Sequence, residues 1–222
     1  MDQNTFVKAY FGGLAKHLAP LGYEPQKLID TVWAGTAAMV KNNGSCTNEV
    51  AFWKLFSSVY GKEQAERDYP HFEVFYRDHF DQVSAVCGHT PSAKQIIEDL
   101  KKRGIRTVLA TNPLFPSIAT EKRMAWAGLS PSDFEVFTTY ENSSFCKPNP
   151  AYYQEILAKI GCSAEECAMV GNDVGEDMIA EKLGMKVFLL TDCIINKKDE
   201  DISQYPHGSF AELRAWLAEI LP

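Results

Sequence analysis

Apolar residues recur at helical spacing through the first third of the chain. Phe6, Tyr10, Leu14 and Leu18 stand four residues apart, as they do on one face of an amphipathic helix. Segments rich in proline, glycine or asparagine separate this stretch from three later ones with the same periodicity. The pattern therefore predicts an all-helical block over residues 1–85, packed as a bundle. The later stretches lie near 28–39, 50–60 and 72–80.

The periodicity changes near residue 88, where short apolar runs begin to alternate with helical patterns. Runs of four to six apolar or β-branched residues have the length of buried strands. Strands that alternate with helices form parallel sheets with right-handed crossovers. Residues 86–222 are therefore expected to form an α/β domain with a Rossmann-like parallel sheet. The expected strands are 105–110, 136–139, 168–171 and 187–190, and the expected helices are 93–103, 115–127, 152–160, 179–183 and 209–220.

Composition limits the classes of partner. The formal net charge is −7 and the pI is near 5.3, and no large basic cluster offsets this acidity, so neither nucleic acid nor a membrane is expected as a partner. The six cysteines form no C-x-x-C pair, which favours a reduced, cytoplasmic setting without zinc. The oligomeric state is left open.

Two aspartates follow one of the predicted strands. The run from Ala168 to Gly171 reads as a buried strand, and Asp173 comes just past its carboxyl end, where open α/β sheets bind ligands. Asp177 is four residues further on and is expected on the same side of a helical turn. A Mg²⁺ ion would hold such a pair of carboxylates together. The alternative is that one aspartate caps the helix while the other lies in solvent.

Two further polar signals accompany this acid pair. Thr111-Asn112 follows a predicted strand and precedes a proline, and Lys147 lies in the loop Cys146-Lys147-Pro148. Hydroxyl and amide groups, a lysine and a metal-binding acid pair are what a phosphoryl group needs, because its charge is neutralised from several directions. We therefore expect these three segments to meet at one edge of the sheet.

In this order and spacing the segments resemble the second, third and fourth motifs of the haloacid dehalogenase superfamily, and the resemblance runs over roughly the whole chain. It implies that Thr111 binds the transferring phosphoryl group, with Asn112 beside it. It also implies that Lys147 stabilises charge on the nucleophile and the phosphate, and that Asp173 holds Mg²⁺ with Asp177 in support. The helical block 1–85 is similar to the mobile cap of that family.

The first motif of the superfamily, an apolar strand ending in D-x-D-G-T with the aspartate nucleophile, has no counterpart here. Asp2-Gln3-Asn4-Thr5 echoes it, but no strand precedes it and asparagine cannot act as the acid. We expect an N-terminal truncation or a misassigned start codon, and little aspartyl-phosphate chemistry from the chain as given. In a folded chain, the strands ending at Thr111 and Gly171 should flank an empty slot or be drawn together.

The leading hypothesis is a Mg²⁺-dependent phosphatase acting on a small phosphorylated metabolite, with latent activity. A dehalogenase would not need the metal, and a non-catalytic module would bind phosphate and metal without turnover. A Schiff-base lysine, as in phosphonate-cleaving relatives, is also left open. The candidate lysines are Lys8, Lys16, Lys41 and Lys54.

Overall fold

The computed structural model describes residues 3–221, and the chain divides into two compact units. Unit 1 comprises Met1–Pro91 and Val108–Cys146, and unit 2 comprises Ser92–Thr107 and Lys147–Pro222. The predicted division into a cap at 1–85 and a core at 86–222 draws the boundary differently and stays a prediction. Asp2 of the echo of the first motif lies outside the described residues.

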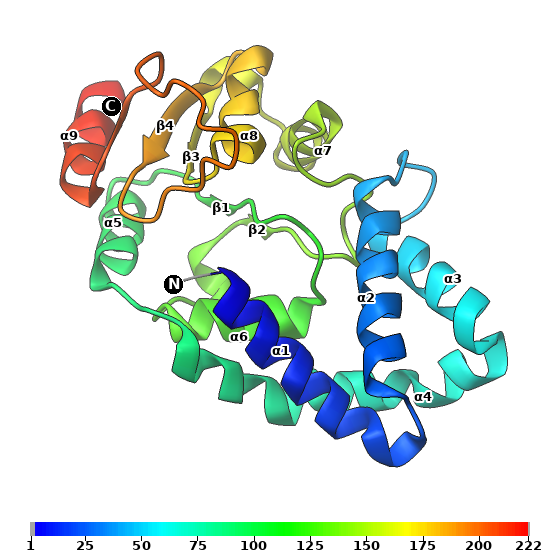
Figure 1. Ribbon diagram of the computed structural model, residues 1–222. Helices are drawn as coiled ribbons and strands as arrows, with labels where there is room; N and C mark the ends of the chain where they lie inside the picture. The colour runs from blue at the N-terminus through cyan, green and yellow to red at the C-terminus, as the bar shows by residue number, and fades with distance from the viewer. Residues whose placement is uncertain (1–2, 222) are drawn as a thin grey trace. The chain divides into compact units, whose positions relative to one another are not determined.

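Unit 1 is mostly helical, as its periodicity predicted, and its first helices run from blue to cyan in Figure 1. Its core is rich in aromatic side chains, among which Phe56, Phe75 and Phe80 are fully buried. The elements are α1 (Gln3–Leu18), η1 (Ala19–Leu21), α2 (Pro25–Val40), α3 (Asn48–Tyr60), α4 (Lys62–Val74), η2 (Phe75–His79), η3 (Phe80–Val86), β1 (Val108–Leu109), α6 (Ser117–Trp126), η4 (Pro131–Asp133) and β2 (Val136–Phe137).

Local capping explains where two of these helices begin. The Glu24 side chain accepts hydrogen bonds from the first free backbone N–H groups of α2, and Pro25 occupies the first helical position, where its missing donor costs nothing. The Thr47 side chain accepts from Val50 N at the start of α3. Both caps satisfy donors that a helix leaves unpaired.

The fourth predicted helix, near 72–80, is not a single α-helix. The chain is α-helical to Val74, π-helical over Phe75–His79 and 3₁₀-helical over Phe80–Val86. The three segments together bury Phe72, Phe75 and Phe80, so packing of the aromatic side chains tolerates a change of helical pitch that spacing alone does not reveal.

Unit 2 contains the second sheet of the protein. β3 and β4 pair in parallel over four residue pairs, and β4 also pairs in parallel with β5. Ile96, Phe188 and Leu213 contribute to the core that covers β4. The elements are α5 (Pro91–Lys102), α7 (Pro150–Ile160), η5 (Ala164–Glu166), β3 (Ala168–Gly171), α8 (Val174–Asp177), η6 (Met178–Leu183), β4 (Lys186–Leu190), β5 (His207–Gly208) and α9 (Phe210–Ile220).

The strands differ from the prediction in length and grouping. The described strands form two parallel sheets, β1-β2 and β3-β4-β5, where we expected one. β1 covers only Val108–Leu109 of the predicted 105–110, and β2 is its one partner among the described strands. β5 was not predicted, because His207–Gly208 has no apolar pattern. It is a strand because it pairs with Leu189 and Leu190 of β4 in the folded chain.

The predicted helix 179–183 begins earlier and is mostly 3₁₀. α8 starts at Val174 because Asp173 caps it, and η6 continues to Leu183. Within residues 3–221, no helix combines the length and the apolar composition that a membrane crossing requires.

Candidate functional site

The carboxyl end of β3 turns directly into α8, as the sequence predicted. Asp173 is the N-cap residue, and its Oδ1 accepts hydrogen bonds from Gly175 N (3.0 Å) and Glu176 N (2.9 Å). Its Oδ2 accepts no hydrogen bond from the described residues. Asp173 therefore has one carboxylate oxygen fixed by the helix and the other available to a ligand.

Asp177 is buried. The alternative interpretation, in which one aspartate caps the helix and the other lies in solvent, is therefore wrong for the second aspartate. Its side chain is only 5% exposed. Oδ2 accepts from Asn172 N and Asp173 N, both at 2.9 Å, and Oδ1 accepts from Lys147 Nζ at 2.6 Å. The carboxylate thus holds together the end of β3, the start of α8 and the loop that carries Lys147.

Gly171 is required by this arrangement. A Cβ atom at this position would overlap the carboxylate and the Cβ of Asp177. Only a residue without a side chain lets the end of β3 lie against a buried carboxylate, and that accounts for the glycine before Asn172 in the motif.

Lys147 is also buried, at 6% exposed. Its ammonium lies over the rings of Tyr152 (5.6 Å to the centroid) and Tyr153 (5.8 Å), so two aromatic faces and one carboxylate surround the charge. The sequence placed both tyrosines on a predicted helix, but no pattern indicated that their rings face this lysine.

Tyr153 links Lys147 to the backbone of α8. Its hydroxyl donates to Glu176 O at 2.8 Å. Burial, and after it the negative charge of Asp177, raises the pKa of the Tyr153 phenol, so the hydroxyl remains a neutral donor across the physiological range.

A second segment of unit 2 supports the Asp173 turn. Val174 N donates to Ile195 O at 3.0 Å, Ile195 N donates to Asn172 O at 2.7 Å, and Asn172 Nδ2 donates to Cys193 O at 2.7 Å. The backbone on both sides of Asp173 is therefore fixed by pairing that resembles an extra strand.

Thr111 and Asn112 follow β1 in unit 1. Thr111 Oγ1 donates to Thr138 O at 3.2 Å, and Thr138 Oγ1 donates to Thr111 O at 2.8 Å. The structure thus brings together Lys147, Asp173 and Asp177 in unit 2, and places Thr111 and Asn112 in unit 1. The meeting of these two sets at one phosphate site stays a prediction.

Asn48 is a residue that the sequence did not single out. It is fully buried at the start of α3, and its Nδ2 lies 3.3 Å from Pro113 O and 3.3 Å from Cys146 Sγ. It therefore fixes the loop just after Asn112 and the residue just before Lys147. A single asparagine after a helix cap carries no sequence signal for such a role.

The described residues offer few ligands for a metal ion. No group of three or more histidine, cysteine or acidic side chains suited to a metal occurs within residues 3–221. Both oxygens of Asp177 are already hydrogen-bonded, whereas Oδ2 of Asp173 is not. The donors therefore fit a cation that takes one carboxylate oxygen from the protein and completes its coordination with water and phosphate, as Mg²⁺ does.

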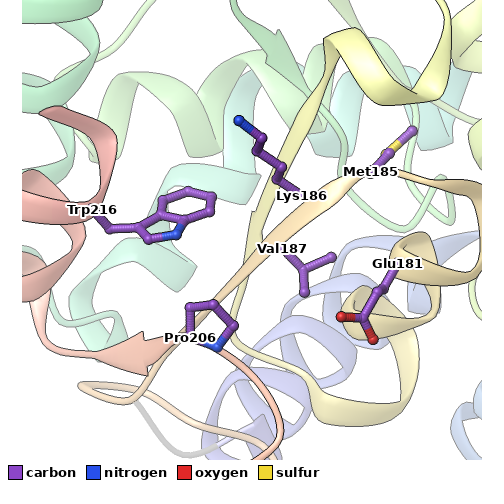
Figure 2. Close-up of a pocket in the computed structure, with 6 residues that line it drawn as sticks. All are labelled: Glu181, Met185, Lys186, Val187, Pro206 and Trp216. Carbon is purple, nitrogen blue, oxygen red and sulfur yellow. The ribbon is translucent and has the colours of Figure 1, made fainter. Parts of the chain in front are cut away.

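A surface pocket of about 290 Å³ in unit 2 is a different place (Figure 2). It lies at the amino end of β4, whereas Asp173 follows the carboxyl end of β3, which runs parallel to β4. This pocket therefore has no part in the predicted phosphate site. Its lining residues are Glu181, Met185, Lys186, Val187, Pro206 and Trp216.

Comparison with curated proteins gives a partial match. The chain is 32% identical over 101 residues to the glyceraldehyde 3-phosphate phosphatase of Methanothermobacter thermautotrophicus. The match covers 45% of this chain and 43% of that protein, so it spans less than half of the relative's length.

Solved structures show the same fold. The 2-haloacid dehalogenase of Pseudomonas syringae pv. Tomato is 17% identical with a TM-score of 0.63, covering 97% of this chain and 92% of that one. The HAD phosphatase of Thermococcus onnurineus is 16% identical with a TM-score of 0.55, covering 96% and 91%. These likenesses confirm the predicted fold class. A family model for haloacid dehalogenase-like hydrolases matches residues 16–183, and the chain therefore belongs to the haloacid dehalogenase-like hydrolases.

Proposed function

We propose that this hydrolase is of the phosphatase type and acts on a small phosphorylated metabolite with the help of Mg²⁺. The observation that carries the proposal is the buried Lys147–Asp177 pair beside Asp173, at the carboxyl end of a parallel strand. Such an edge is where α/β folds bind ligands. The pair fixes a buried ammonium group in the same unit as Asp173, whose Oδ2 remains available to a ligand.

Each residue has a distinct role in this proposal. Asp173 holds the metal through Oδ2, and Asp177 supports it by fixing the backbone N–H of Asp173 and the ammonium of Lys147. Lys147 and Thr111 neutralise and orient the phosphoryl group, with Asn112 beside it. When bound, Mg²⁺ supplies positive charge that stabilises the transferring phosphoryl group.

The covalent step needs an aspartate nucleophile, and residues 1–222 contain no D-x-D-G-T sequence. We therefore expect little turnover from this chain alone, together with retained affinity for phosphate. The helical block 1–85 is proposed as the cap that excludes water from the reacting group.

The substrate class and the location are supported by separate observations. The relative that is 32% identical over 101 residues is named for a three-carbon sugar phosphate, and this supports a substrate of similar size. The six cysteines of the sequence form no C-x-x-C pair, which favours a reduced cytoplasmic setting. The acidic net charge of −7 argues against nucleic acid as a partner.

Calorimetry with inorganic phosphate, with and without MgCl₂, tests the binding half of the proposal. We expect phosphate binding to require Mg²⁺ and to weaken severalfold in Thr111→Val. Thr36→Val is the matched control, because the Thr36 hydroxyl bonds only within its own helix, to Val32 O. Equal phosphate affinity in Thr111→Val and in the parent chain would contradict the proposed role of Thr111.

Turnover of p-nitrophenyl phosphate tests the catalytic half. We expect a rate near background for this chain, and Mg²⁺-dependent hydrolysis when a strand ending in D-x-D-G-T is placed before residue 1. Robust hydrolysis by the unmodified chain, abolished in Asp173→Ala, would show that the nucleophile lies within residues 1–222. Metal-independent release of chloride from 2-chloropropionate would favour a dehalogenase, and phosphate binding without turnover in the extended chain would favour a binding module.

A further inference from the structure

Two cysteines bracket a short turn in unit 2, away from the residues of the proposed phosphate site. α7 ends at Ile160, its C-cap residue Gly161 has a left-handed conformation, and Cys162 follows directly. The 3₁₀ helix η5 comes next, and Cys167 is its C-cap residue, just before β3. A single tight turn therefore separates the two cysteines.

The turn between the cysteines is held by a reciprocal cap. Ser163 N donates to Glu166 Oε2 at 2.8 Å, and Cys167 N donates to Ala164 O at 3.0 Å. The backbone on the far side is tied to the sheet by Lys186 N, which donates to Cys167 O at 3.1 Å. Both ends of the turn are thus fixed by the fold.

The two thiols lie at the ends of the same capped turn, and an arginine contacts the first of them. The Cys162 thiol is near enough to be among the causes that raise the pKa of the Cys167 thiol. Arg106 Nη1 donates to Cys162 Sγ at 3.0 Å, and its Nη2 donates to Ile160 O. The guanidinium group is therefore held against the first sulfur by the carbonyl that ends α7.

The two sulfurs differ in environment. Burial is the main cause that raises the pKa of the Cys167 thiol, followed by Cys162, while Arg106 acts in the opposite direction. A cation in contact with sulfur stabilises the negative charge that sulfur carries when it attacks a disulfide. Cys162, which accepts the hydrogen bond from Arg106, is thus the better placed to react first.

We propose that Cys162 and Cys167 form a thiol–disulfide exchange site that reacts with low-molecular-weight disulfides such as oxidised glutathione. This assignment does not depend on the proposed phosphatase function. The site would carry a reversible modification, because exchange with excess small thiol returns both cysteines to the reduced state.

The exchange balances in two steps. The Cys162 thiol loses its proton and attacks one sulfur of the small disulfide, a mixed disulfide forms, and one small thiolate leaves and takes that proton. Cys167 then loses its proton and attacks the Cys162 sulfur, and the second small thiolate leaves and takes that proton. Two electrons pass from the protein to the small disulfide, so an internal disulfide and two small thiols are the products.

Digestion with trypsin isolates the site for measurement. Cleavage after Lys159 and Lys182 gives peptide 160–182, which contains Cys162 and Cys167 and no other cysteine. Treatment of the folded chain with oxidised glutathione should lower the mass of this peptide by two hydrogen atoms and protect it from iodoacetamide. Dithiothreitol should restore alkylation at both cysteines.

Cys193 serves as the control, because it is an exposed free cysteine and the sole cysteine of peptide 187–197. That peptide should gain glutathione and never lose two hydrogens. In Cys167→Ser, peptide 160–182 should keep glutathione on Cys162, since no resolving thiol remains. Arg106→Gln should slow formation of the internal disulfide severalfold, while Arg103→Gln, on another arginine of unit 2, should not.

Three results would overturn the proposal. One is a 160–182 peptide that stays fully alkylated after oxidation, and another is a stable mixed disulfide on it while Cys167 is present. The third is an unchanged rate in Arg106→Gln. Repeating the reaction in urea guards against an unfolding artefact, because preferred closure between Cys162 and Cys167 should be lost as the turn unfolds.

Discussion

Lys147 and Asp177 form a buried ion pair in which Nζ lies 2.6 Å from Oδ1. The two residues are 30 positions apart in the chain, so the pair joins a loop to the last residue of α8. Because Asp177 also accepts two backbone hydrogen bonds, the carboxylate is the centre of the site and the ammonium is one of its three donors.

Asp177→Ala should therefore destabilise the chain more than Lys147→Met. The first change leaves a buried ammonium and two backbone N–H groups without their acceptor, and we expect a loss of about 3–5 kcal/mol in the free energy of unfolding. The second leaves a carboxylate that keeps two backbone donors, and we expect about 2–3 kcal/mol. Urea unfolding followed by circular dichroism measures both.

Lys159→Met is the control for this prediction. Lys159 lies on α7 of the same unit, and its Nζ is 3.5 Å from Glu155 Oε1 with a side chain that is 30% exposed. A partly exposed pair of this kind contributes no more than about 0.5 kcal/mol. If Lys147→Met proved as costly as Asp177→Ala, the carboxylate would not be the centre of the arrangement.

Replacement by alanine should change the free energy of unfolding in opposite directions at Gly35 and Gly12. A Cβ at Gly35 would lie 2.5 Å from the Phe52 ring, whereas a Cβ at Gly12 meets nothing within 4 Å. Overpacking at Gly35 should cost about 1–3 kcal/mol, while Gly12→Ala in the interior of α1 should gain about 0.5–1 kcal/mol from helix propensity.

Urea unfolding of the two alanine variants checks this contrast. Both glycines are helical, so backbone propensity alone predicts stabilisation of both. A stabilised Gly35→Ala would mean that Phe52 can move aside at little cost.

The sequence could predict those parts of the site that are local. The apolar run to Gly171 and the aspartate after it specify a strand end and an N-cap through neighbouring residues, and β3 and α8 follow accordingly. The burial of Asp177 was not readable, because its partner Lys147 comes from a loop whose path is set by tertiary packing. The same holds for the tyrosine rings over Lys147.

The strands show the same limit. β5 consists of His207–Gly208, which has no apolar alternation, and it exists because Leu189 N donates to Pro206 O and Thr191 N donates to Gly208 O. Residues 105–110 have strand composition, but extended composition becomes a strand only where a neighbour supplies hydrogen bonds. Periodicity reports which face is apolar, and it does not report which partner is present.

Asp68 should make unit 1 sensitive to acid. Its carboxylate accepts from Arg67 Nε (2.8 Å) and from the Tyr23 hydroxyl (2.9 Å). Burial raises the pKa of Asp68 and is the largest single cause, but the hydrogen bonds from Arg67 and Tyr23 together lower the pKa below its usual value.

A depressed folded-state pKa means that the unfolded chain binds a proton first as the pH falls. The stability that Asp68 contributes is therefore fully present above its unfolded pKa of about 3.9 and is lost as the pH falls through the lower folded value. Asp68→Asn should be less stable than the parent at about pH 5 and lose less stability between about pH 5 and pH 3. Asp30→Asn, at an exposed position on α2, is the control and should lose as much stability as the parent between about pH 5 and pH 3. An equal loss of stability in Asp68→Asn and the parent over this pH range would contradict the prediction.

Asp173 has two roles in our proposal, and two substitutions separate them. As the N-cap of α8 it uses Oδ1, and as a metal ligand it would use Oδ2. Asparagine caps helices about as well as aspartate, whereas alanine in place of a cap costs about 1 kcal/mol. Asp173→Asn should therefore keep the unfolding free energy of the parent chain, and Asp173→Ala should lose stability.

Binding of Mg²⁺ should depend on the negative charge at position 173 and not on the stability of the variant. Mg²⁺ strongly prefers a carboxylate oxygen to an amide oxygen in a site with few protein ligands, so calorimetry with MgCl₂ and inorganic phosphate should show loss of binding in both variants. If Asp173→Asn retained Mg²⁺ binding while Asp173→Ala lost it, binding would depend on the helix cap and not on the carboxylate charge. Asp173 would then not be the metal ligand, and other groups would have to hold the metal, because asparagine preserves the turn but carries no negative charge.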